Sequence, residues 1–583
     1  AQRRPQQAGW LRMMWYLTDP NRWASEQATL ATLEEEASWL TITGTRLDDV
    51  FRVVVDFEIA TGNDIFAASL RYPQAFPFAP PSVIPKIPAR LSEHQYGTGE
   101  LCLERGPDNW TPETCGAELI RSAERLLASE AKAPIGPAEV PSRHQLTLGQ
   151  EHRGEWGRGL VTAEMAERLS ALPPGHTRLA KFWWVKWPET RVILVVGLAD
   201  DGGAVKDDDS VPIAQLPNGT DWSGLAFTLP PSEALPKFKS VAALRAHLGE
   251  LGFSAPDGYS AAKVEFLLIW GAASPRLFWL WDDDDVYECA VITGGASQRL
   301  SVDHQKLTGK NVGIVGCGSL GSKIATSLAR SGVRNFLLVD DDLLLPENLV
   351  RNDLDWSGMG EHKADALARR LELVAPGVIV TVRRLRLGGQ EASGAADWLL
   401  TRLQGCDLII DATAEPGVFN LLAAVVHAAQ KALIWVEVFA GGFGGLIARS
   451  RPGLDPAPQQ ARLRIEGWCA ERGVATPIAA RGYATGSDIA PMIADDADVS
   501  VIAAHAARFA IDTLIGRAPS AYPVSAYLIG LAEEWLFTQP FHTIPLDLGA
   551  ALAQDTKAPA DPAAIEAVIQ LLRDRNDHAA DAA

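Results

Sequence analysis

A glycine-rich turn between an apolar run and a helical pattern constrains the fold of this chain more than any other feature. The apolar run 311–315 leads directly into a G-x-G-x-x-G motif, a helical pattern continues to about residue 331, and a second apolar run, 335–339, ends at an aspartate. This order predicts a βαβ unit in which glycines permit a tight turn, phosphates bind at the helix N-terminus and the acid reaches a ribose. The residues concerned are Gly316, Gly318, Gly321 and Asp340.

Further polar residues follow the motif at Asn348, Arg351, Lys363 and Asp411. A hydride-transfer enzyme needs no arginine and lysine directed past the first phosphates. An enzyme that binds ATP and adenylates a carboxylate does need them, because the charge of the triphosphate must be neutralised. The pattern therefore favours adenylation over two alternatives, a dinucleotide dehydrogenase and glycines that only pack a helix against a strand.

The segment from about residue 307 to residue 447 resembles the ThiF/MoeB and ubiquitin-activating adenylation fold. Arg351 lies eleven residues after Asp340, as in the pattern of that family. The resemblance implies ATP and Mg²⁺ as cofactors and a homodimer formed through this domain. It also implies that Asp340 holds the ribose, Arg351 and Lys363 contact phosphates, Asn348 orders the site and Asp411 positions the metal ion.

The length of 583 residues is sufficient for two to four domains. Composition and motifs divide the chain at about 1–145, 146–292 and 293–583. The first part combines a helical pattern at 27–36 with strand-like runs at 39–43, 51–59 and 65–72. The middle part shows no chemistry and is interpreted as a linker or adaptor. The expected fold class is thus a multidomain protein with α+β and α/β parts.

Four short motifs in the first part resemble the ubiquitin-conjugating (UBC) fold. They are Tyr-Pro at 72–73, Pro-Pro at 80–81, Gly-x-x-Cys-Leu at 99–103 and Trp-x-Pro at 110–112. The resemblance implies that Cys102 carries an acyl group as a thioester. The chemistry agrees, because sulfur is a good nucleophile near neutral pH and a thioester keeps the acyl group reactive. A buried, unreactive thiol is the alternative.

The chain departs from the UBC pattern eight residues before Cys102, where His94 stands in place of an asparagine that supports the oxyanion. Here His-Gln-Tyr replaces the usual His-Pro-Asn. We expect His94 to donate a hydrogen bond to the tetrahedral intermediate or to deprotonate the attacking lysine. A histidine that only orders its loop is the alternative.

A second thioester cysteine is expected after the adenylation core, since activating enzymes of this kind usually carry one. Cys469 is the only cysteine C-terminal to Asp411, and it lies in a Pro/Gly/polar connection at about 449–498, where the family has its crossover loop. The alternative is an incidental thiol beside a tryptophan. Arg299 weakly matches an arginine that relatives insert into the ATP site of a partner subunit.

Charge, apolar runs and cysteine usage restrict the class of substrate and the cellular compartment. The net charge of −19 disfavours a nucleic-acid substrate. No apolar run approaches the roughly 20 residues that span a bilayer. Six scattered cysteines without an apolar signal region predict a reducing cytoplasm. No C-x-x-C pair is present, so the zinc site of many ThiF-like proteins is missing.

The order of the parts resembles the bacterial fused ubiquitin-activating and ubiquitin-conjugating-like enzymes of CBASS anti-phage operons. The resemblance implies that the carboxyl terminus of a ubiquitin-like protein, or of a cyclic-oligonucleotide synthase (CD-NTase), is adenylated, passed to Cys469 and then Cys102, and joined to an amine. A sulfur-carrier adenylyltransferase would not need the first part, and a nicotinamide-dependent oxidoreductase would have no use for Cys102. Intact Asp340, Arg351, Lys363 and Asp411 disfavour a non-catalytic scaffold.

Overall fold

The computed structural model divides into two compact units, Ala1–Arg153 and Gly154–Ala583. None of the helices it describes combines the length and apolar character needed to cross a membrane. His94 and Arg299 lie outside the described residues. Those residues are 14–61, 64–87, 95–96, 99–132, 149, 152–216, 219–230, 233, 235–260, 263–271, 275–281, 284–294, 300–388, 393–477, 494–551, 561–563 and 565–570.

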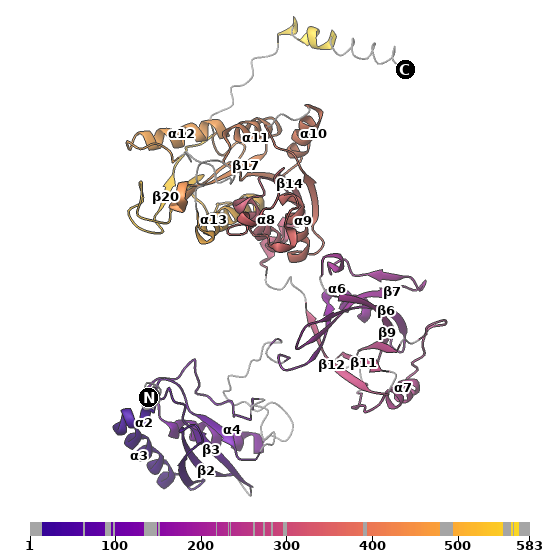
Figure 1. Cartoon of the computed structure of the whole chain (residues 1–583), viewed down its shortest axis with the longest axis vertical. Coiled ribbons are helices and arrows are strands. Elements are labelled where there is room, and N and C mark those ends of the chain that lie inside the picture. Colours follow the sequence, from indigo (N-terminus) through magenta and orange to yellow (C-terminus); the bar gives the residue numbers. More distant parts are fainter. Residues whose placement is uncertain are drawn as a thin grey trace, which may run out of the picture. The chain divides into compact units, whose positions relative to one another are not determined.

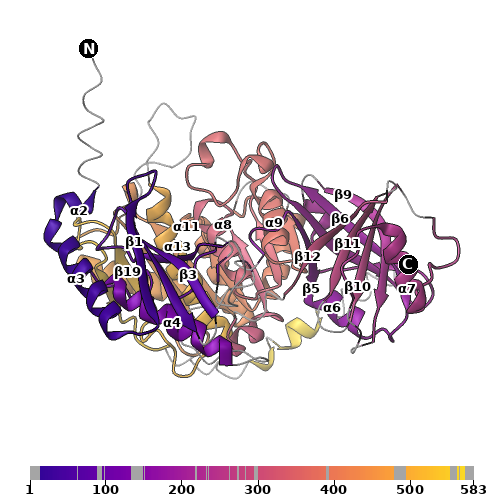
Figure 2. The same ribbon diagram turned by 90° about the horizontal axis from the view of Figure 1, so that it is seen from below.

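The first unit contains an antiparallel four-stranded sheet (Figure 2). Helices α2 and α3 precede the sheet in the sequence, and α4 follows it. Helices α3 and α4 contact each other and pack on the sheet around one apolar core. The strands predicted at 39–43, 51–59 and 65–72 and the helix at 27–36 are confirmed. In chain order the elements are α2 (Trp15–Thr18), α3 (Pro20–Glu36), β1 (Leu40–Leu47), β2 (Val53–Thr61), β3 (Asp64–Arg71), β4 (Ser82–Pro85) and α4 (Gly116–Lys132).

A buried carboxylate joins α3 and α4 to the end of β3. Glu26 is only 1% exposed. Its Oε2 accepts hydrogen bonds from the Tyr72 hydroxyl and the Gly116 N–H, both at 2.8 Å, and Arg22 contacts Oε1 at 3.0 Å. The charge is therefore paired and hydrogen-bonded, as a buried charge must be. These contacts fix the start of α4 against α3.

The middle of the chain closes into a β-barrel. Its sheet order is β5-β12-β11-β10-β9-β6-β7-β8, and an additional parallel pairing of the first strand, β5, with β7 closes the barrel, while β8 extends beyond it on β7. Aromatic and aliphatic side chains fill the interior, and α7 covers part of the outer face. The elements are β5 (Gly157–Thr162), α6 (Ala163–Ser170), β6 (Thr177–Lys186), β7 (Arg191–Ala199), β8 (Val205–Asp207), η1 (Ile213–Gln215), β9 (Gly219–Thr228), α7 (Val241–Glu250), β10 (Val264–Trp270), β11 (Arg276–Trp281) and β12 (Val286–Gly294).

The C-terminal part is an eight-stranded sheet of order β15-β14-β13-β16-β17-β18-β19-β20. The first five strands are parallel and the last three antiparallel. The predicted βαβ unit is confirmed as β13, α8 and β14. The strands are β13 (Asn311–Val315), β14 (Asn335–Val339), β15 (Ile379–Arg383), β16 (Leu408–Asp411), β17 (Ala432–Val438), β18 (Gly444–Ser450), β19 (Ala526–Gly530) and β20 (Thr543–Leu546).

Helices cover both faces of this sheet (Figure 1). Helices α8, α9 and α13 pack on one face, and α10, α11 and α12 pack on the other. Because both faces are covered, the central strands are apolar on both sides, which is why they read as continuous apolar runs. The helices are α8 (Ser319–Arg330), α9 (Lys363–Val374), α10 (Ser393–Gln404), α11 (Pro416–Ala429), α12 (Pro458–Ala470) and α13 (Asp496–Ile515); short 3-10 turns are η3 (Val302–Leu307), η4 (Pro346–Asn348), η5 (Trp356–Gly358) and η6 (Ala440–Gly442).

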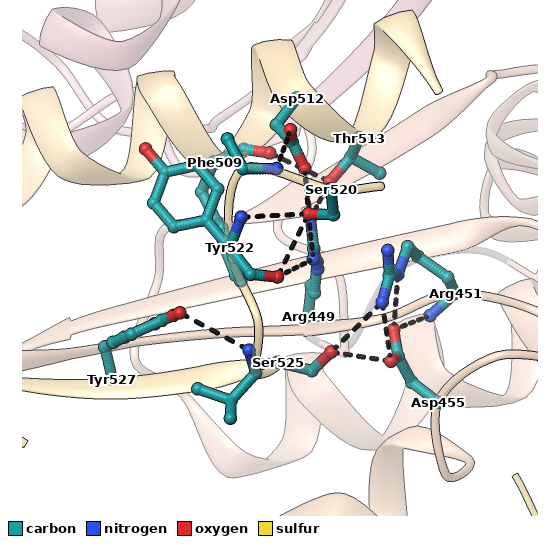
Figure 3. A network of polar contacts seen from close by, with 12 residues as sticks. Arg449, Arg451, Asp455, Phe509, Asp512, Thr513, Ser520, Tyr522, Ser525 and Tyr527 are labelled. Carbon is teal, nitrogen blue, oxygen red and sulfur yellow. Dashed lines mark hydrogen bonds and ion pairs between the residues drawn. The ribbon is translucent and has the colours of Figure 1, made fainter. Parts of the chain in front are cut away.

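A buried ion pair joins β18 to α13 and to the loop after it (Figure 3). The Arg449 side chain is fully buried and donates to Asp512 Oδ2 at 2.9 Å and to Ser520 Oγ at 2.9 Å. Its guanidinium lies 4.3 Å from the ring centroid of Phe509. Burial raises the pKa of Asp512, but hydrogen bonds from Ser520 and Ala521 and the charge of Arg449 outweigh it, so the pKa is lower than usual.

We expect Asp512→Ala to lower the free energy of unfolding of the C-terminal part by about 3–5 kcal/mol, because it leaves the Arg449 charge buried without its partner. Hydrogen exchange of peptides from α13 measures the loss as faster exchange. The control is Asp303→Asn, which removes an exposed pair with Lys306 (3.0 Å) and should change little.

The stability that the Arg449–Asp512 pair contributes depends on pH. Because the pKa of Asp512 is lower in the folded state, its contribution is present above the unfolded value near 3.9 and is lost as the pH falls through the folded pKa. Protection of α13 should therefore fall below about pH 4 in the wild type and vary less with pH in Asp512→Ala. Equal loss in both proteins would contradict this role of Asp512.

Candidate functional site

A cavity of about 440 Å³ lies at the carboxyl ends of β13, β14 and β16. The chain passes from β13 outward to β14 and β15 and then returns to β16 on the other side of β13. Ligands of open α/β sheets bind at such a switch point. Six of the predicted residues line the cavity: Gly316, Gly318, Asp340, Asn348, Arg351 and Lys363.

The glycine loop needs its glycines for two different reasons. Gly316 has a φ of +89°, a backbone conformation that side chains disfavour. Gly321 does not line the cavity; a Cβ there would stand 1.8 Å from the carbonyl oxygen of Gly316. Gly318 is the N-cap of α8, and a Cβ there would meet nothing within 4 Å. The loop thus brings the N–H groups at the start of α8, with the positive end of the helix dipole, to the cavity.

These glycines allow a matched pair of substitutions. We expect Gly321→Ala to remove nucleotide binding, because the new Cβ forces the start of α8 away from the loop. Gly318→Ala fits the free loop and should leave the fold intact, so a weaker affinity in that variant reports a ligand that approaches the backbone closely. Nucleotide titration with circular dichroism separates the two effects. Unchanged binding in Gly321→Ala would contradict a role of this loop.

Asp340 connects the end of β14 to the glycine loop. Its Oδ2 accepts the Cys317 N–H at 2.6 Å and its Oδ1 accepts the Asp342 N–H at 2.8 Å. Burial raises the pKa of Asp340 above its usual value, partly against these hydrogen bonds and the nearby Lys363 charge. A carboxylate offers about four acceptor positions, so two remain for a ribose hydroxyl. Lys363 begins α9, and its Nζ contacts Asp342 at 2.9 Å.

Asp411 is not brought together with the other predicted residues. It is 3% exposed, and its Oδ1 accepts hydrogen bonds from the N–H (3.0 Å) and hydroxyl (2.7 Å) of Thr413. Burial raises its pKa. It lines a second, far smaller cavity of about 10 Å³ together with Glu437 and Arg462. Asp411 does not line the large cavity, so its metal role stays a prediction.

An acidic group that could hold a metal ion does stand at the large cavity. Asp340, Asp341 and Asp342 each offer an oxygen, and these atoms lie within 4.8 Å of one another. All three residues line the cavity. Carboxylate oxygens are the ligands that Mg²⁺ takes in nucleotide sites, where one or two carboxylates and the phosphates suffice. The donor set fits that ion.

Sequence reasoning missed other residues of the cavity. Asn352 is 8% exposed, donates to the Cys317 carbonyl at 3.4 Å and accepts from the Leu354 N–H at 3.1 Å. Arg386 and Glu415 pair at 3.2 Å. Arg386 follows the carboxyl end of β15 and Glu415 that of β16. Their position after parallel strands is the sequence signal that could have predicted them.

Cys469 lies on a helix, which differs from the expected connection at about 449–498. β18 continues to Ser450, α13 begins at Asp496, and α12 occupies much of the interval, while residues 478–493 lie outside the described part. Ala461, Ile465 and Cys469 are spaced by four residues and are all buried, so they form the inner stripe of α12. Burial also raises the pKa of the Cys469 thiol. Because Cys469 is in the last turn, unwinding of that turn would expose it.

Cys102 belongs to the first unit, where it is 2% exposed. Its sulfur lies 3.5 Å from the hydroxyl oxygen of Tyr96. In the C-terminal part, burial raises the pKa of the Cys406 thiol to about 11 and that of the Cys317 thiol well above its usual range. Cys115 directly precedes α4.

Residues 296–521 match the model of the ThiF family. The ThiF-type adenylation domain expected from the resemblance is thereby confirmed. The uncharacterised protein y4qC of Sinorhizobium fredii is 36% identical over 152 residues, which are 25% of this chain and 26% of that protein. The ATP-dependent ubiquitin transferase-like protein Cap2 of Pseudomonas aeruginosa is 32% identical over 146 residues, 24% of this chain and 25% of that protein.

The chain therefore spans about a quarter of the length of the curated relatives that it matches. A crystal structure of MccB from E. coli with ATP covers 44% of this chain and 69% of its own, at 17% identity and a TM-score of 0.33. That likeness is too low to support a conclusion about this chain.

Proposed function

We propose that this chain uses ATP to activate the C-terminal carboxylate of a partner protein, carries the acyl group as a thioester and joins it to an amine. The observation that carries the proposal is the cavity in which Arg351 and Lys363 stand beside the glycine loop and Asp340. The name of the Cap2 relatives, ATP-dependent ubiquitin transferase-like protein, supports it. The partner would be a ubiquitin-like protein or a CD-NTase, in anti-phage defence.

In the first step an oxygen of the partner's carboxylate attacks the α-phosphorus of ATP. The bond to the β-phosphate oxygen breaks, pyrophosphate leaves, and an acyl-adenylate remains. The N–H groups at the start of α8 bind phosphate oxygens, Asp340 accepts from a ribose hydroxyl, and Arg351 and Lys363 neutralise the charge that moves onto pyrophosphate. A magnesium ion bound with ATP would share this neutralisation, with Asp340, Asp341 and Asp342 available to hold it.

In the later steps sulfur takes the place of phosphate. The Cys469 thiolate attacks the acyl carbonyl and AMP leaves; the Cys102 thiolate then attacks the new thioester and Cys469 leaves. An amine finally attacks the carbonyl carbon of the thioester on Cys102, which forms an amide and releases the Cys102 thiolate. The four-stranded antiparallel sheet, which follows α3 and precedes α4 in the sequence, supports the UBC-like interpretation of the first unit. His94 as an oxyanion donor or base and the homodimer both stay predictions.

Nucleotide selectivity tests the proposal against its rivals. We expect isothermal titration calorimetry to detect ATP with Mg²⁺ and to detect NAD weakly or not at all. An oxidoreductase would bind NAD more tightly than ATP. Tight NAD binding without ATP binding would contradict the proposal. A sulfur-carrier adenylyltransferase would bind ATP but form no thioester at Cys102, so trapping the thioester under non-reducing conditions separates that rival.

A further inference from the structure

Backbone hydrogen bonds on both sides of Tyr96 place it beside Cys102. Gln95 and Leu101 pair in an antiparallel bridge. The Tyr96 N–H donates to the carbonyl of Glu100, and the Gly99 N–H donates to the carbonyl of Tyr96, both at 2.8 Å. Gly99 has a φ of +89°, which only glycine adopts without strain. These backbone hydrogen bonds therefore fix the position from which the tyrosine side chain extends.

The cysteine is held just as firmly on its own side. The Leu101 N–H donates to the carbonyl of Val83, on β4, at 2.9 Å. Leu101, Cys102 and Leu103 are 3%, 2% and 5% exposed. The 3.5 Å contact between the Tyr96 hydroxyl oxygen and the Cys102 sulfur thus joins two groups whose backbones are both anchored.

We propose that the Tyr96 hydroxyl donates a hydrogen bond to the Cys102 sulfur whenever that sulfur is negatively charged. A neutral thiol is the donor in this contact, and a hydroxyl both donates and accepts, so it turns its proton toward the sulfur once the thiol loses its own. Hydrogen bonds to charged groups are about twice as strong as those between neutral groups, and a low local dielectric strengthens them further. Tyr96 is in this sense a catalytic residue, since it touches the reacting sulfur.

This inference rests on the proposed function for its role in turnover. During transfer the amine nitrogen attacks the thioester carbonyl, the C–S bond breaks, and its electron pair departs on the Cys102 sulfur. The proton of the resulting ammonium passes to solvent. Tyr96 stabilises the sulfur that leaves, whereas the predicted role of His94 concerns the carbonyl oxygen or the amine. The same contact stabilises the thiolate that attacks during loading.

The decisive variant is Tyr96→Phe, which keeps the ring and removes the hydroxyl. At pH 7.5 we expect iodoacetamide to modify Cys102 about 3- to 10-fold more slowly, with the pH–rate profile moved to higher pH. Mass spectrometry of the Cys102 peptide distinguishes this thiol from the other five. For turnover, Cys102 is acylated by exchange with a short peptide thioester, and discharge to free lysine should be about 10-fold slower in the variant.

The control is Tyr16→Phe in the same unit, where the hydroxyl donates to the Phe51 carbonyl at 3.2 Å; both rates should stay unchanged. Equal alkylation and discharge in Tyr96→Phe and the wild type would overturn the inference. Neither measurement uses ATP or the partner. Failure of ATP and a partner to load Cys102 would therefore overturn the proposed function alone, and the alkylation result would still decide the role of Tyr96.

Discussion

Replacing Cys102 with alanine is expected to abolish conjugation completely, while a thioester still forms on Cys469 and accumulates there. The reason is spatial: adenylation needs a phosphate-lined cavity, whereas transfer to an amine needs access for an acceptor. One thiol can hardly serve both, and the two cysteines belong to different compact units. Cys469→Ala should leave adenylation intact and remove the thioester from Cys102.

Non-reducing electrophoresis of a partner incubated with ATP measures both species. Cys115→Ala is the matched control, because this thiol is in the same unit as Cys102, directly before α4, and has no step assigned to it. If Cys469→Ala still charges Cys102 at the normal rate, the acyl group passes directly from the adenylate. Cys469 would then serve only to pack the buried face of α12.

The second large effect concerns the charges of the cavity. We expect Arg351→Ala and Lys363→Ala each to lower the rate of adenylation by about 10²–10³-fold, because each removes a cation that stabilises the charge that develops on pyrophosphate. Arg351→Lys should recover part of the loss, since charge returns without the planar fork of the guanidinium.

Lys310→Ala is the control for this pair of variants. Lys310 precedes β13, at the opposite end of the strand from the cavity, and contacts Asp407 at 3.8 Å. Its removal should leave the rate within about twofold. A loss in Lys310→Ala equal to that in Lys363→Ala would mean that overall charge, and not the position of the cation, matters.

The sequence predicted the βαβ unit well because its signals are local. The apolar runs became β13 and β14, and Gly316 and Gly321 meet a backbone and a steric requirement, respectively, that arise within a few residues. Asp340 follows directly on β14, but Arg351 and Lys363 were placed beside it by the resemblance to the adenylation family, and all three line the cavity.

Other features depend on contacts that sequence patterns do not record. The barrel closes through the parallel pairing of β5 with β7, which no short-range pattern specifies. The helix around Cys469 was missed because the apolar residues Leu463 and Trp468 lie off its buried stripe of Ala461, Ile465 and Cys469 and obscure the helical period. Asp411 does not line the large cavity, and Thr413, two residues later, supplies its Oδ1 with two hydrogen bonds, a local side-chain contact typical of aspartate that a motif does not record.

Exchange of labelled pyrophosphate into ATP tests the central claim most directly. The assay uses a ubiquitin-like protein or CD-NTase that co-purifies with the chain, once with its free C-terminal carboxylate and once with that terminus amidated. Because adenylation is reversible and needs the carboxylate, we predict exchange with the free terminus, none with the amidated one, and a loss of about 10²–10³-fold in Lys363→Ala. Exchange that does not depend on the carboxylate would contradict the proposal that this chain activates a protein C-terminus.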